Sequence, residues 1–427
     1  MKIYLVGGAV RDHYLGQVAK DRDYCVVGAS IDEMVSLGFK SVGKDFPVFL
    51  HPKTGDEYAL ARTERKIGPG YSGFAVNVAS TVTLEEDLSR RDLTINAMAM
   101  DQSGNLTDPY GGAADLKDGI LRHVSEAFAE DPVRILRIAR FSARHSRFVI
   151  ADETKALMRS MVNAGEVDHL VPERVWQELS KGLMESKPSR MIEVLRECGA
   201  LARILPELDN LHGVPQRSDH HPEVDTLIHV LMALDLAASE DQNLAVRFAV
   251  LMHDLGKGLT PADILPGHHG HESAGVPLVR QLCDRLKVPS DCRELAALVS
   301  EYHTHVHRAK IMKITSVAAL LKNADAFRRP ERFNDFLTAC MMDARGRLGF
   351  ADAPYPQKAY LVHALEAANT VDLPALVESV KDKKFLGQRI HAARASAIKA
   401  AIIGPGLSKD DVDESESKTS AIDRPQG

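Results

Sequence analysis

The spacing of apolar residues along the chain changes near residue 126. Before this point, short apolar runs separated by glycines predict strands, whereas after it apolar residues recur at helical intervals to about residue 400. The predicted strands are 2–8 (KIYLVGG), 23–29 (DYCVVGA), 46–52 (FPVFLHP) and 57–64 (EYALARTE). Residues 93–101 (LTINAMAMD) fit either a strand or a helix. The pattern predicts an α+β segment followed by an almost wholly helical one.

Composition narrows the classes of protein that this chain can represent. Its 427 residues predict about two to four domains. Hydrophobic residues make up 44% and charged residues 26%, as in ordinary globular proteins, and the net charge of −6 excludes a globally basic nucleic-acid coat but not a local basic face. The five cysteines are an odd number without a CxxC pair, which fits a reducing cytoplasm. No apolar run approaches the roughly 18–20 residues of a membrane span, so we expect a cytoplasmic protein with no membrane partner.

The first candidate site begins in LVGGAVRD (5–12), between a strand and a predicted helix. Gly7 and Gly8 allow close approach of the backbone to a phosphate, and Arg11 follows one helical turn later. Asp21 and Asp23 come next, in DRDY. If they lie in a strand, they share one face, where two carboxylates repel each other unless a cation such as Mg²⁺ lies between them. Taken alone, each feature also fits a plain turn or a solvated loop.

Arginines dominate two later segments. RRDLTINAMAM (90–100) contains Arg91, for which we expect a phosphate contact, while Arg90 fits a surface charge equally well. EDPVRILRIAR (130–140) repeats polar residues every three positions, which makes them neighbours on a helix. An Asp with an Arg at this spacing can match the hydrogen-bonding edge of a base; without the upstream motifs, a salt-bridged helix surface is as good an interpretation. The residues of this helix are Asp131, Arg134, Arg137 and Arg140.

Together, in this order, GGAVRD, DRDY, RRDLTINAMAM, DPYGGAADL and EDPVRILRIARF resemble the class II tRNA nucleotidyltransferases, the CCA-adding enzymes. The resemblance implies a polymerase-beta-like head followed by a mostly α-helical neck and body. It implies that Asp21 and Asp23 bind Mg²⁺ as the catalytic pair, and that Glu130, Asp131 and Arg134 form a protein template that selects CTP and then ATP. It places residues 65–76 in a loop needed for that switch, and it gives 172–183 (PERVWQELSKGL) a structural, helix-capping role. The implied nucleotide contacts are Gly8, Arg11, Arg91, Asp131, Arg134, Arg137 and Arg140.

Eleven of the 18 histidines lie between His212 and His307, and they form the second candidate site. His229 and the adjacent pair His253–Asp254 interrupt apolar helical patterns, which is costly unless a partner satisfies these side chains. Imidazole and carboxylate ligands suit Ni, Mn, Co, Fe or Zn. A lone histidine in such a helix is more often a satisfied core residue. The set with HHGHE (268–272), however, resembles the metal site of HD-superfamily phosphohydrolases.

An HD domain behind such a head is similar to bacterial CCA-adding enzymes that carry a C-terminal HD domain. The resemblance implies an all-α HD domain with phosphatase, 2′-nucleotidase and 2′,3′-cyclic phosphodiesterase activities, assisted by Ni²⁺ or another divalent metal. His229, His253 and Asp254 are the implied ligands, and His303 and His305 are further candidates. Lys257 fits a phosphate contact. Asp343 and Arg345 in MMDARG (341–346) could be functional, but the sequence favours a helix surface for them.

The sequence therefore predicts five segments. They are a head with the nucleotide-selecting helix at its end (1–139), a tRNA-binding neck and body (140–211), an HD domain (212–330), a helical tail (331–403) and a disordered end (404–427). The expected partners are the tRNA acceptor end, CTP and ATP, with Arg140, Arg144, Arg147 and Lys155 as phosphate contacts, in a monomer or a homodimer. Three alternatives remain at this point: a bacterial poly(A) polymerase, a regulatory uridylyltransferase and a non-catalytic RNA-binding module.

Overall fold

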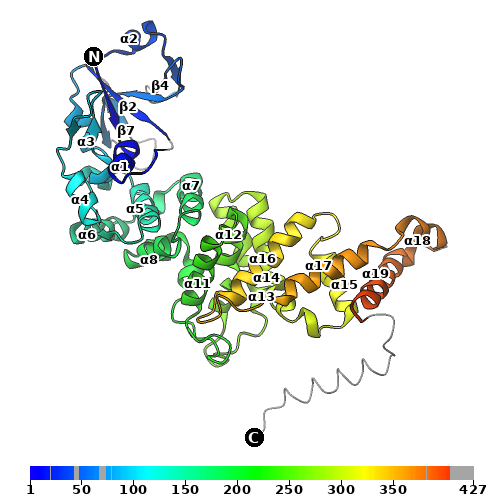
Figure 1. Ribbon diagram of the computed structural model, residues 1–427. Coiled ribbons are helices and arrows are strands. Elements are labelled where there is room, and N and C mark those ends of the chain that lie inside the picture. Colours follow the sequence, from blue (N-terminus) through cyan, green and yellow to red (C-terminus); the bar gives the residue numbers. More distant parts are fainter. Residues whose placement is uncertain (20, 43–47, 67–73, 78, 381, 404–427) are drawn as a thin grey trace. The chain divides into compact units, whose positions relative to one another are not determined.

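The structure is a computed structural model that describes residues 1–19, 21–42, 48–66, 74–77, 79–380 and 382–403, with the side chains of 64–66 and 74–77 left out. The chain forms two compact units, each described here by itself (Figure 1). Unit 1 comprises Met1–Val214, Ala238–Leu244 and Gln281–Pro289, and unit 2 comprises Pro215–Ala237, Ala245–Arg280 and the chain from Ser290 onward.

Unit 1 begins with a seven-stranded mixed sheet in the order β3-β4-β5-β2-β1-β8-β9. Strand β2 runs antiparallel to β1 and parallel to β5, so that Asp23 pairs with Val6 on one side and with Glu57 on the other. The end of β1 and the start of β2 therefore lie at the same edge of the sheet. The strands are β1 (Lys2–Val6), β2 (Asp23–Val27), β3 (Lys40–Val42), β4 (Val48–Leu50), β5 (Glu57–Leu60), β8 (Ala99–Met100) and β9 (Leu106–Thr107).

Alternation along β2 divides the apolar core between the two faces of this sheet. Cys25 packs with Val6 and Leu88 on one face, while Val26 packs with Met34 and Phe49 on the other. The helices of this part are α1 (Gly8–Tyr14), α2 (Ile31–Ser36), α3 (Leu84–Ser89) and α4 (Gly112–Asp118). Two short strand pairs complete it: β6 (Thr63–Lys66) with β7 (Phe74–Asn77), and β10 (Ile120–Leu121) with β11 (Val149–Ile150).

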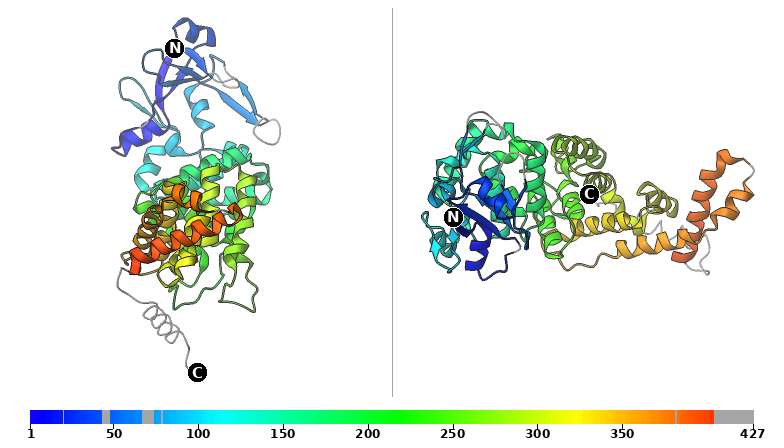
Figure 2. Two further views of the ribbon diagram at one scale, coloured as in Figure 1. Left: turned by 90° about the vertical axis from the view of Figure 1, so that its right-hand side faces the viewer. Right: turned by 90° about the horizontal axis from the view of Figure 1, so that it is seen from above.

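Residues 93–101 combine both predicted alternatives, since a 3₁₀ turn, η1 (Thr94–Asn96), is followed directly by β8. The predicted loop at 65–76 is bounded by β6 and β7, but its central residues 67–73 lie outside the described residues. All described strands belong to the first 150 residues, drawn from blue to blue-green in Figure 2. The mixed sheet followed by helices confirms the predicted α+β fold class.

The rest of unit 1 is helical and is organised around α5, which packs against α7 and α8 (Figure 1). Helix α5 continues across residue 139, where the sequence places the end of the head. The helices are α5 (Val133–Arg144), α6 (Asp152–Asn163), α7 (Pro172–Leu183), α8 (Ser189–Glu197), α9 (Ala200–Ile204) and α10 (Pro206–Asp209).

Most residues of the remaining helices belong to unit 2, while the ends of α11 and α13 and the first residue of α12 belong to unit 1. Within unit 2, α14 packs against α16, and α17 against α19. In the part of the chain that the structure describes, no helix is both long and apolar enough to cross a membrane. The predicted disordered end at 404–427 lies outside the described residues. The helices are α11 (Thr226–Ser239), α12 (Leu244–Met252), α13 (His271–Leu286), α14 (Ser290–His307), α15 (Ile314–Asn323), α16 (Pro330–Arg345), α17 (Pro356–Asn369), α18 (Leu373–Ser379) and α19 (Leu386–Ile403).

Candidate active sites

A basic cavity of about 690 Å³ in unit 1 brings together residues from three separate sequence motifs. Ten of its lining side chains are Arg or Lys and four are Asp or Glu, so the chain with a negative net charge has a local basic site. Asp23 lies at its wall. All seven predicted nucleotide contacts line it: Gly8, Arg11, Arg91, Asp131, Arg134, Arg137 and Arg140.

The backbone conformation of the turn between β1 and α1 explains why glycine stands there. Gly7 has φ 67° and ψ −132°, a conformation that side chains of L-residues rarely adopt. A Cβ atom at Gly7 would also lie 3.0 Å from Arg91 Nη1. Helix α1 begins at Gly8. This turn therefore places the backbone of Gly7 and Gly8, and the Arg11 side chain one helical turn later, at the cavity wall.

Asp21 and Asp23 lie together, but not in the way that the strand alternation predicts. Strand β2 begins at Asp23, so Asp21 precedes the strand, and both side chains line an adjoining hollow with Asp56 and Glu57. Desolvation raises the pKa of Asp23; Arg91 opposes this shift and the nearby Asp21 carboxylate adds to it. A cation between the two carboxylates would relieve this repulsion. Since Asp23 belongs to both cavities, such a cation would lie at the edge of the basic one.

Buried carboxylates hold the arginines of the cavity in place. Arg137 Nε donates to Asp92 Oδ2 at 2.7 Å, and Arg140 Nε donates to Glu178 Oε2 at 2.6 Å. Arg91 Nη2 lies 3.1 Å from an oxygen of Asp87. Because these guanidinium groups are oriented before any ligand arrives, little reorganisation is needed to bind an anion.

Neighbouring groups also orient the two residues of the predicted template. Both oxygens of Asp131 accept hydrogen bonds from the Arg174 guanidinium, at 3.1 and 2.7 Å. Arg134 donates to the carbonyl oxygens of Ala127 and Arg90, each at 2.7 Å. Arg174 comes from α7, the helix to which the sequence assigns only a structural role, and it lines the cavity with Glu178.

The second candidate site lies in unit 2, around a cavity of about 400 Å³ that His253 and Asp343 both line. His229 Nε2 lies 3.0 Å and His253 Nε2 3.5 Å from Asp343 Oδ1, while His253 Nε2 lies 3.0 Å from Asp254 Oδ2. All four side chains are buried. The predicted ligands His229 and His253 thus form, with Asp343, a set that could hold a metal ion, and the third predicted ligand, Asp254, lies directly beside His253.

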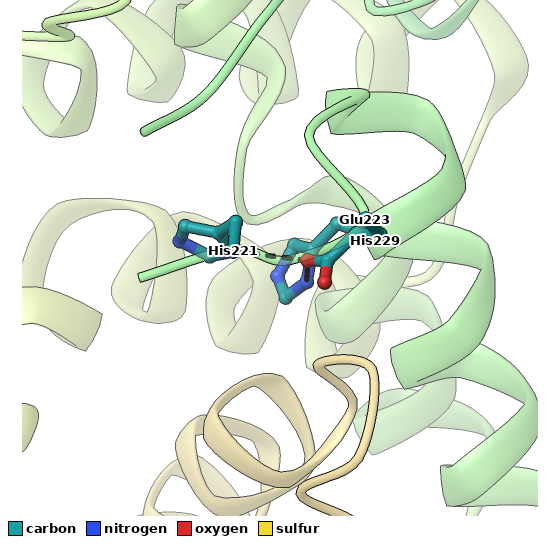
Figure 3. Close-up of side chains that lie close together, drawn as sticks. All are labelled: His221, Glu223 and His229. Carbon is teal, nitrogen blue, oxygen red and sulfur yellow. Dashed lines mark hydrogen bonds and ion pairs between the residues drawn. The ribbon is translucent and has the colours of Figure 1, made fainter. Parts of the chain in front are cut away.

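The far ring nitrogens of the two histidines fix how these rings face the site. His253 Nδ1 lies 2.7 Å from the carbonyl oxygen of Val250, and His229 Nδ1 lies 2.9 Å from the Glu223 carboxylate (Figure 3). Both partners are acceptors, so each Nδ1 carries the hydrogen and each Nε2 can offer a lone pair to a metal. Burial disfavours the charged form of His253, but Asp254 and Asp343 outweigh it and raise its pKa to about 9. A bound divalent metal would replace that proton, so the donor set fits a metal.

The assignment of Asp343 to a helix surface is wrong. Its side chain on α16 is 7% exposed; Oδ1 faces the two histidines and Oδ2 lies 2.7 Å from His307 Nε2. Gly346 explains how α16 reaches this position, because a Cβ atom there would collide with the backbone of Ala233 on α11. Of the further candidates, His303 is buried beside Asp254, whereas His305 is exposed and packs on Tyr302.

Three regions of the chain, which include residues of both sites, match known protein families. Residues 3–122 match "Poly A polymerase head domain", residues 147–211 match "Probable RNA and SrmB- binding site of polymerase A" and residues 226–329 match "HD domain". A multifunctional CCA protein of Dechloromonas aromatica is 60% identical over 406 residues, covering 95% of this chain and 98% of the relative. One from Chromobacterium violaceum is 62% identical over 398 residues, covering 93% and 98%. The chain belongs to the multifunctional CCA protein family.

As a member of this family, the chain is a CCA tRNA nucleotidyltransferase that also carries an HD phosphohydrolase domain. This membership decides against the three alternatives that the sequence left open. A solved structure of the Thermotoga maritima CCA-adding enzyme, complexed with tRNA, has the same fold, with a TM-score of 0.60 at 20% identity and coverage of 98% of this chain and 91% of that one.

No site role was predicted from the sequence for four residues that lie at the first site or beside it: Asp87, Asp92, Arg174 and Glu178. Asp92 stands inside RRDLTINAMAM, and Arg174 and Glu178 stand inside PERVWQELSKGL, so the motifs contained the signal. Their roles follow from the contacts with Arg137, Arg140 and Asp131, which join segments far apart in the chain.

We expect Asp92→Asn to lower the free energy of unfolding by about 1–3 kcal/mol at neutral pH. Burial would raise the pKa of Asp92, but Arg137 and Asn96 outweigh it and hold that pKa well below the usual range. The ionised form therefore stabilises the folded chain above about pH 4, the unfolded-state pKa, and this contribution is lost as the pH falls below it. Urea unfolding at pH 7 and pH 3 measures the effect, with the exposed Asp118→Asn as control. The same difference in free energy of unfolding between wild type and Asp92→Asn at both pH values would contradict this prediction.

Proposed function

We propose that the basic cavity of unit 1 binds CTP and then ATP for addition to the tRNA 3′ end, with Asp21 and Asp23 holding Mg²⁺ at its edge. One observation carries this proposal: Asp23 and all seven predicted nucleotide contacts line one cavity. Mg²⁺ prefers a few carboxylates together with phosphate oxygens, and the paired carboxylates with a raised pKa at Asp23 fit that preference. The bound ion would supply charge for activating the 3′-hydroxyl and for steadying the α-phosphate.

The arginines act on the triphosphate. Arg11, Arg91, Arg137 and Arg140 present guanidinium forks toward the space beside Asp23, where they bind phosphate oxygens and stabilise the charge that develops on the departing pyrophosphate. Their acidic partners keep these forks in position and exchange part of their contacts for phosphate oxygens when a nucleotide enters.

Asp131 and Arg134 select the base in this proposal. Asp131 Oδ1 accepts hydrogen bonds from Arg174 and from the Val133 backbone N–H, and these keep the carboxylate oriented. Oδ2 can accept a second hydrogen bond in addition to the one from Arg174, so it can take an amino hydrogen of cytosine or adenine. The Arg134 guanidinium, held at the carbonyls of Ala127 and Arg90, supplies donors to ring acceptors of the base.

We expect Arg174→Met to weaken this selection without removing catalysis. Loss of the bidentate contact frees the Asp131 side chain to rotate, so that the preference for CTP over UTP falls by about tenfold or more, the equivalent of about 1.4 kcal/mol. Steady-state kcat/KM for CTP and UTP on tRNA lacking its 3′ end measures the ratio. Arg190→Met, which removes a surface pair with Glu193, is the control; equal preference in the two variants contradicts the role of Arg174.

The tRNA acceptor end is proposed to bind along the helices after α5, where residues 147–211 match the RNA-binding family. Of the predicted phosphate contacts, Arg140 and Arg144 line the cavity, while Arg147 is exposed and Lys155 pairs with Asp152. Such backbone contacts position an RNA without reading its sequence. The Thermotoga neighbour, which shares this fold, was solved with tRNA bound.

The test incubates the purified protein with tRNA that lacks its 3′ end, giving CTP and ATP separately and together. Growth by two residues with CTP alone and by one more with ATP supports the proposal. Long adenosine tails with ATP alone would instead indicate poly(A) polymerase activity and would contradict the selecting role of Asp131 and Arg134.

For the HD domain we propose a divalent metal, Ni²⁺ or another transition metal, held by His229, His253, Asp254 and Asp343. The mixed imidazole and carboxylate donors suit such ions. The proposed substrates are phosphomonoesters, 2′-nucleotides and 2′,3′-cyclic phosphates. Lys257 and Arg347 line the cavity that opens onto these ligands and supply positive charge for a phosphate.

We also propose the domain organisation that the sequence predicts: a head at 1–139, a tRNA-binding body at 140–211, an HD domain at 212–330 and a helical tail at 331–403. Asp343 adds a metal ligand from the start of that tail to the HD domain. We place the enzyme in the cytoplasm, which suits its five free cysteines, as a monomer or a homodimer.

A further inference from the structure

One aromatic ring lies among the arginines of the basic cavity in unit 1. Phe141 on α5 lines this cavity and is only 4% exposed, so other groups cover most of its ring. The Cζ atom of Arg140 lies over the ring at 4.7 Å from its centroid, and that of Arg11 lies over it at 5.2 Å. The Cζ atom of Arg137 follows at 6.0 Å. Three arginines that we propose as triphosphate contacts thus approach the same ring.

The ring joins segments that are far apart in the sequence. Arg11 belongs to α1, directly after the glycine turn, whereas Arg140 precedes Phe141 on α5. A guanidinium group within about 6 Å of a ring centroid is attracted to the negative face of the ring. Phe141 can therefore attract one cation from the sheet region and others from its own helix, and hold them close together.

The burial of Arg11 makes this attraction more important. Arg11 is 3% exposed; burial lowers its pKa, Asp12 opposes this shift and Arg144 adds to it. Removing a guanidinium group from water is costly unless other groups compensate for the lost hydration. The face of an aromatic ring supplies part of that compensation, and it does so more strongly at a desolvated site than at an exposed one.

An aromatic ring differs from a carboxylate in what it leaves free for a ligand. Asp12 Oδ1 accepts hydrogen bonds from Arg11 Nε and Nη2 at 3.0 and 2.8 Å, and Glu178 accepts one from Arg140 Nε. Each carboxylate offsets a positive charge and occupies N–H donors. The ring of Phe141 carries no net charge, so it attracts the guanidinium groups and leaves their charge and their remaining N–H donors to an anion.

The histidine that follows α5 adds no positive charge to this group. The ring of His145 is nearly parallel to that of Phe141, with an interplanar angle of 12° and 6.5 Å between the centroids. Burial lowers the pKa of His145 to about 4, and Arg11 and Arg144 contribute to the shift. The imidazole is therefore neutral at pH 7 and does not repel the guanidinium groups.

We propose that Phe141 is a positioning residue for nucleotidyl transfer, whose ring orients Arg11 and Arg140 toward the triphosphate of CTP or ATP. This inference rests on the triphosphate role proposed above for the two arginines. Because the guanidinium groups are ordered before the nucleotide arrives, less side-chain entropy is lost on binding. The contribution of the ring should therefore appear in the affinity for the triphosphate and not in the affinity for tRNA.

Fluorination tests the ring with little change in its shape. Fluorine withdraws electron density from the ring face, so 4-fluoro-, 3,5-difluoro- and 3,4,5-trifluorophenylalanine at position 141 should weaken the cation–π attraction in steps. The full chain with each residue is dialysed against labelled CTP in the presence of Mg²⁺. We expect the dissociation constant to rise stepwise, by about tenfold in total. Inhibition by pyrophosphate should weaken in parallel, whereas KM for tRNA should not change.

Phe148 offers a matched control, because its ring packs on His145 with 5.0 Å between the centroids. The same fluorinated series at position 148 should leave the dissociation constant for CTP unchanged. The thermal unfolding midpoint shows whether each protein is folded.

The outcomes separate this inference from the proposed function. Arg11→Met and Arg140→Met should each weaken CTP binding by about tenfold or more. Wild-type affinity in both variants would overturn the triphosphate assignment and the inference with it. Weaker binding in these variants, together with a constant affinity across the series at position 141, would overturn the inference alone. An equal loss in all three fluorinated proteins, with a raised KM for tRNA, would indicate a packing defect and would also overturn it.

Discussion

Alanine at Asp23 is expected to lower the rate of CCA addition by about a thousandfold or more while hydrolysis by the HD domain continues at its normal rate. The carboxylate is proposed to hold Mg²⁺ at the edge of the cavity, and such an ion contributes several kcal/mol of charge stabilisation, about tenfold in rate for each 1.4 kcal/mol. Asp21→Ala should behave alike, because the two carboxylates line the same hollow. Single-turnover incorporation of labelled CTP measures the loss.

The control is Asp118→Ala, which removes an exposed carboxylate from helix α4 in the same unit. It should add CTP at the normal rate. Asp23 is not part of the apolar core, so its replacement should also leave the thermal unfolding midpoint of the protein within about 2 °C of wild type. Normal incorporation by Asp23→Ala would refute the assignment of the metal to this pair.

Asparagine at Asp343 is expected to lower HD phosphohydrolase activity by about a thousandfold while CCA addition persists. The change is nearly isosteric, yet it removes the negative charge that faces His229 Nε2 and His253 Nε2 at 3.0 and 3.5 Å. Because Asp343 is proposed as a metal ligand, loss of its charge should remove several kcal/mol of metal-dependent stabilisation. Hydrolysis of 2′,3′-cyclic AMP with added Ni²⁺ measures one activity, and CTP incorporation into tRNA measures the other.

Glu331→Gln is the matched control, because it removes one carboxylate charge from the exposed start of the same helix, α16. It should hydrolyse the cyclic nucleotide normally. Full hydrolysis by Asp343→Asn would show that Asp343 is a structural partner of His307 rather than a ligand, and the HD metal would then depend on the three residues that the sequence predicts.

The sequence was most informative about the first site because its motifs are local. Gly8 and Arg11 stand within one turn after a strand, and Arg134, Arg137 and Arg140 stand on one helix, so periodicity alone predicts which of them share a face. The structure places these groups around one cavity with Asp23. Strand β2 begins at Asp23, where the predicted strand 23–29 also begins, so Asp21 precedes the strand and its position beside Asp23 does not follow from strand alternation.

The second site shows the limit of such reasoning. The pair His253–Asp254 was recognisable because adjacent polar residues break an apolar pattern. The structure places the pair directly after α12, which ends at Met252, and not inside a helix. Asp343 was not recognisable, since an aspartate in a polar helix has the same local pattern whether it faces water or a metal. Only the close approach of α16 to α11 at Gly346 and Ala233 decides that its carboxylate is buried beside His229.

By itself, then, the sequence determined the α+β order of the chain, the nucleotidyl-transfer motifs and the presence of an HD pair, since each depends on neighbours within a few residues. The tertiary structure decided which carboxylates hold the arginines and that Asp343 is buried beside His229 and His253. The reason is physical: burial and ligand geometry arise from the packing of distant helices, and no local spacing encodes that packing.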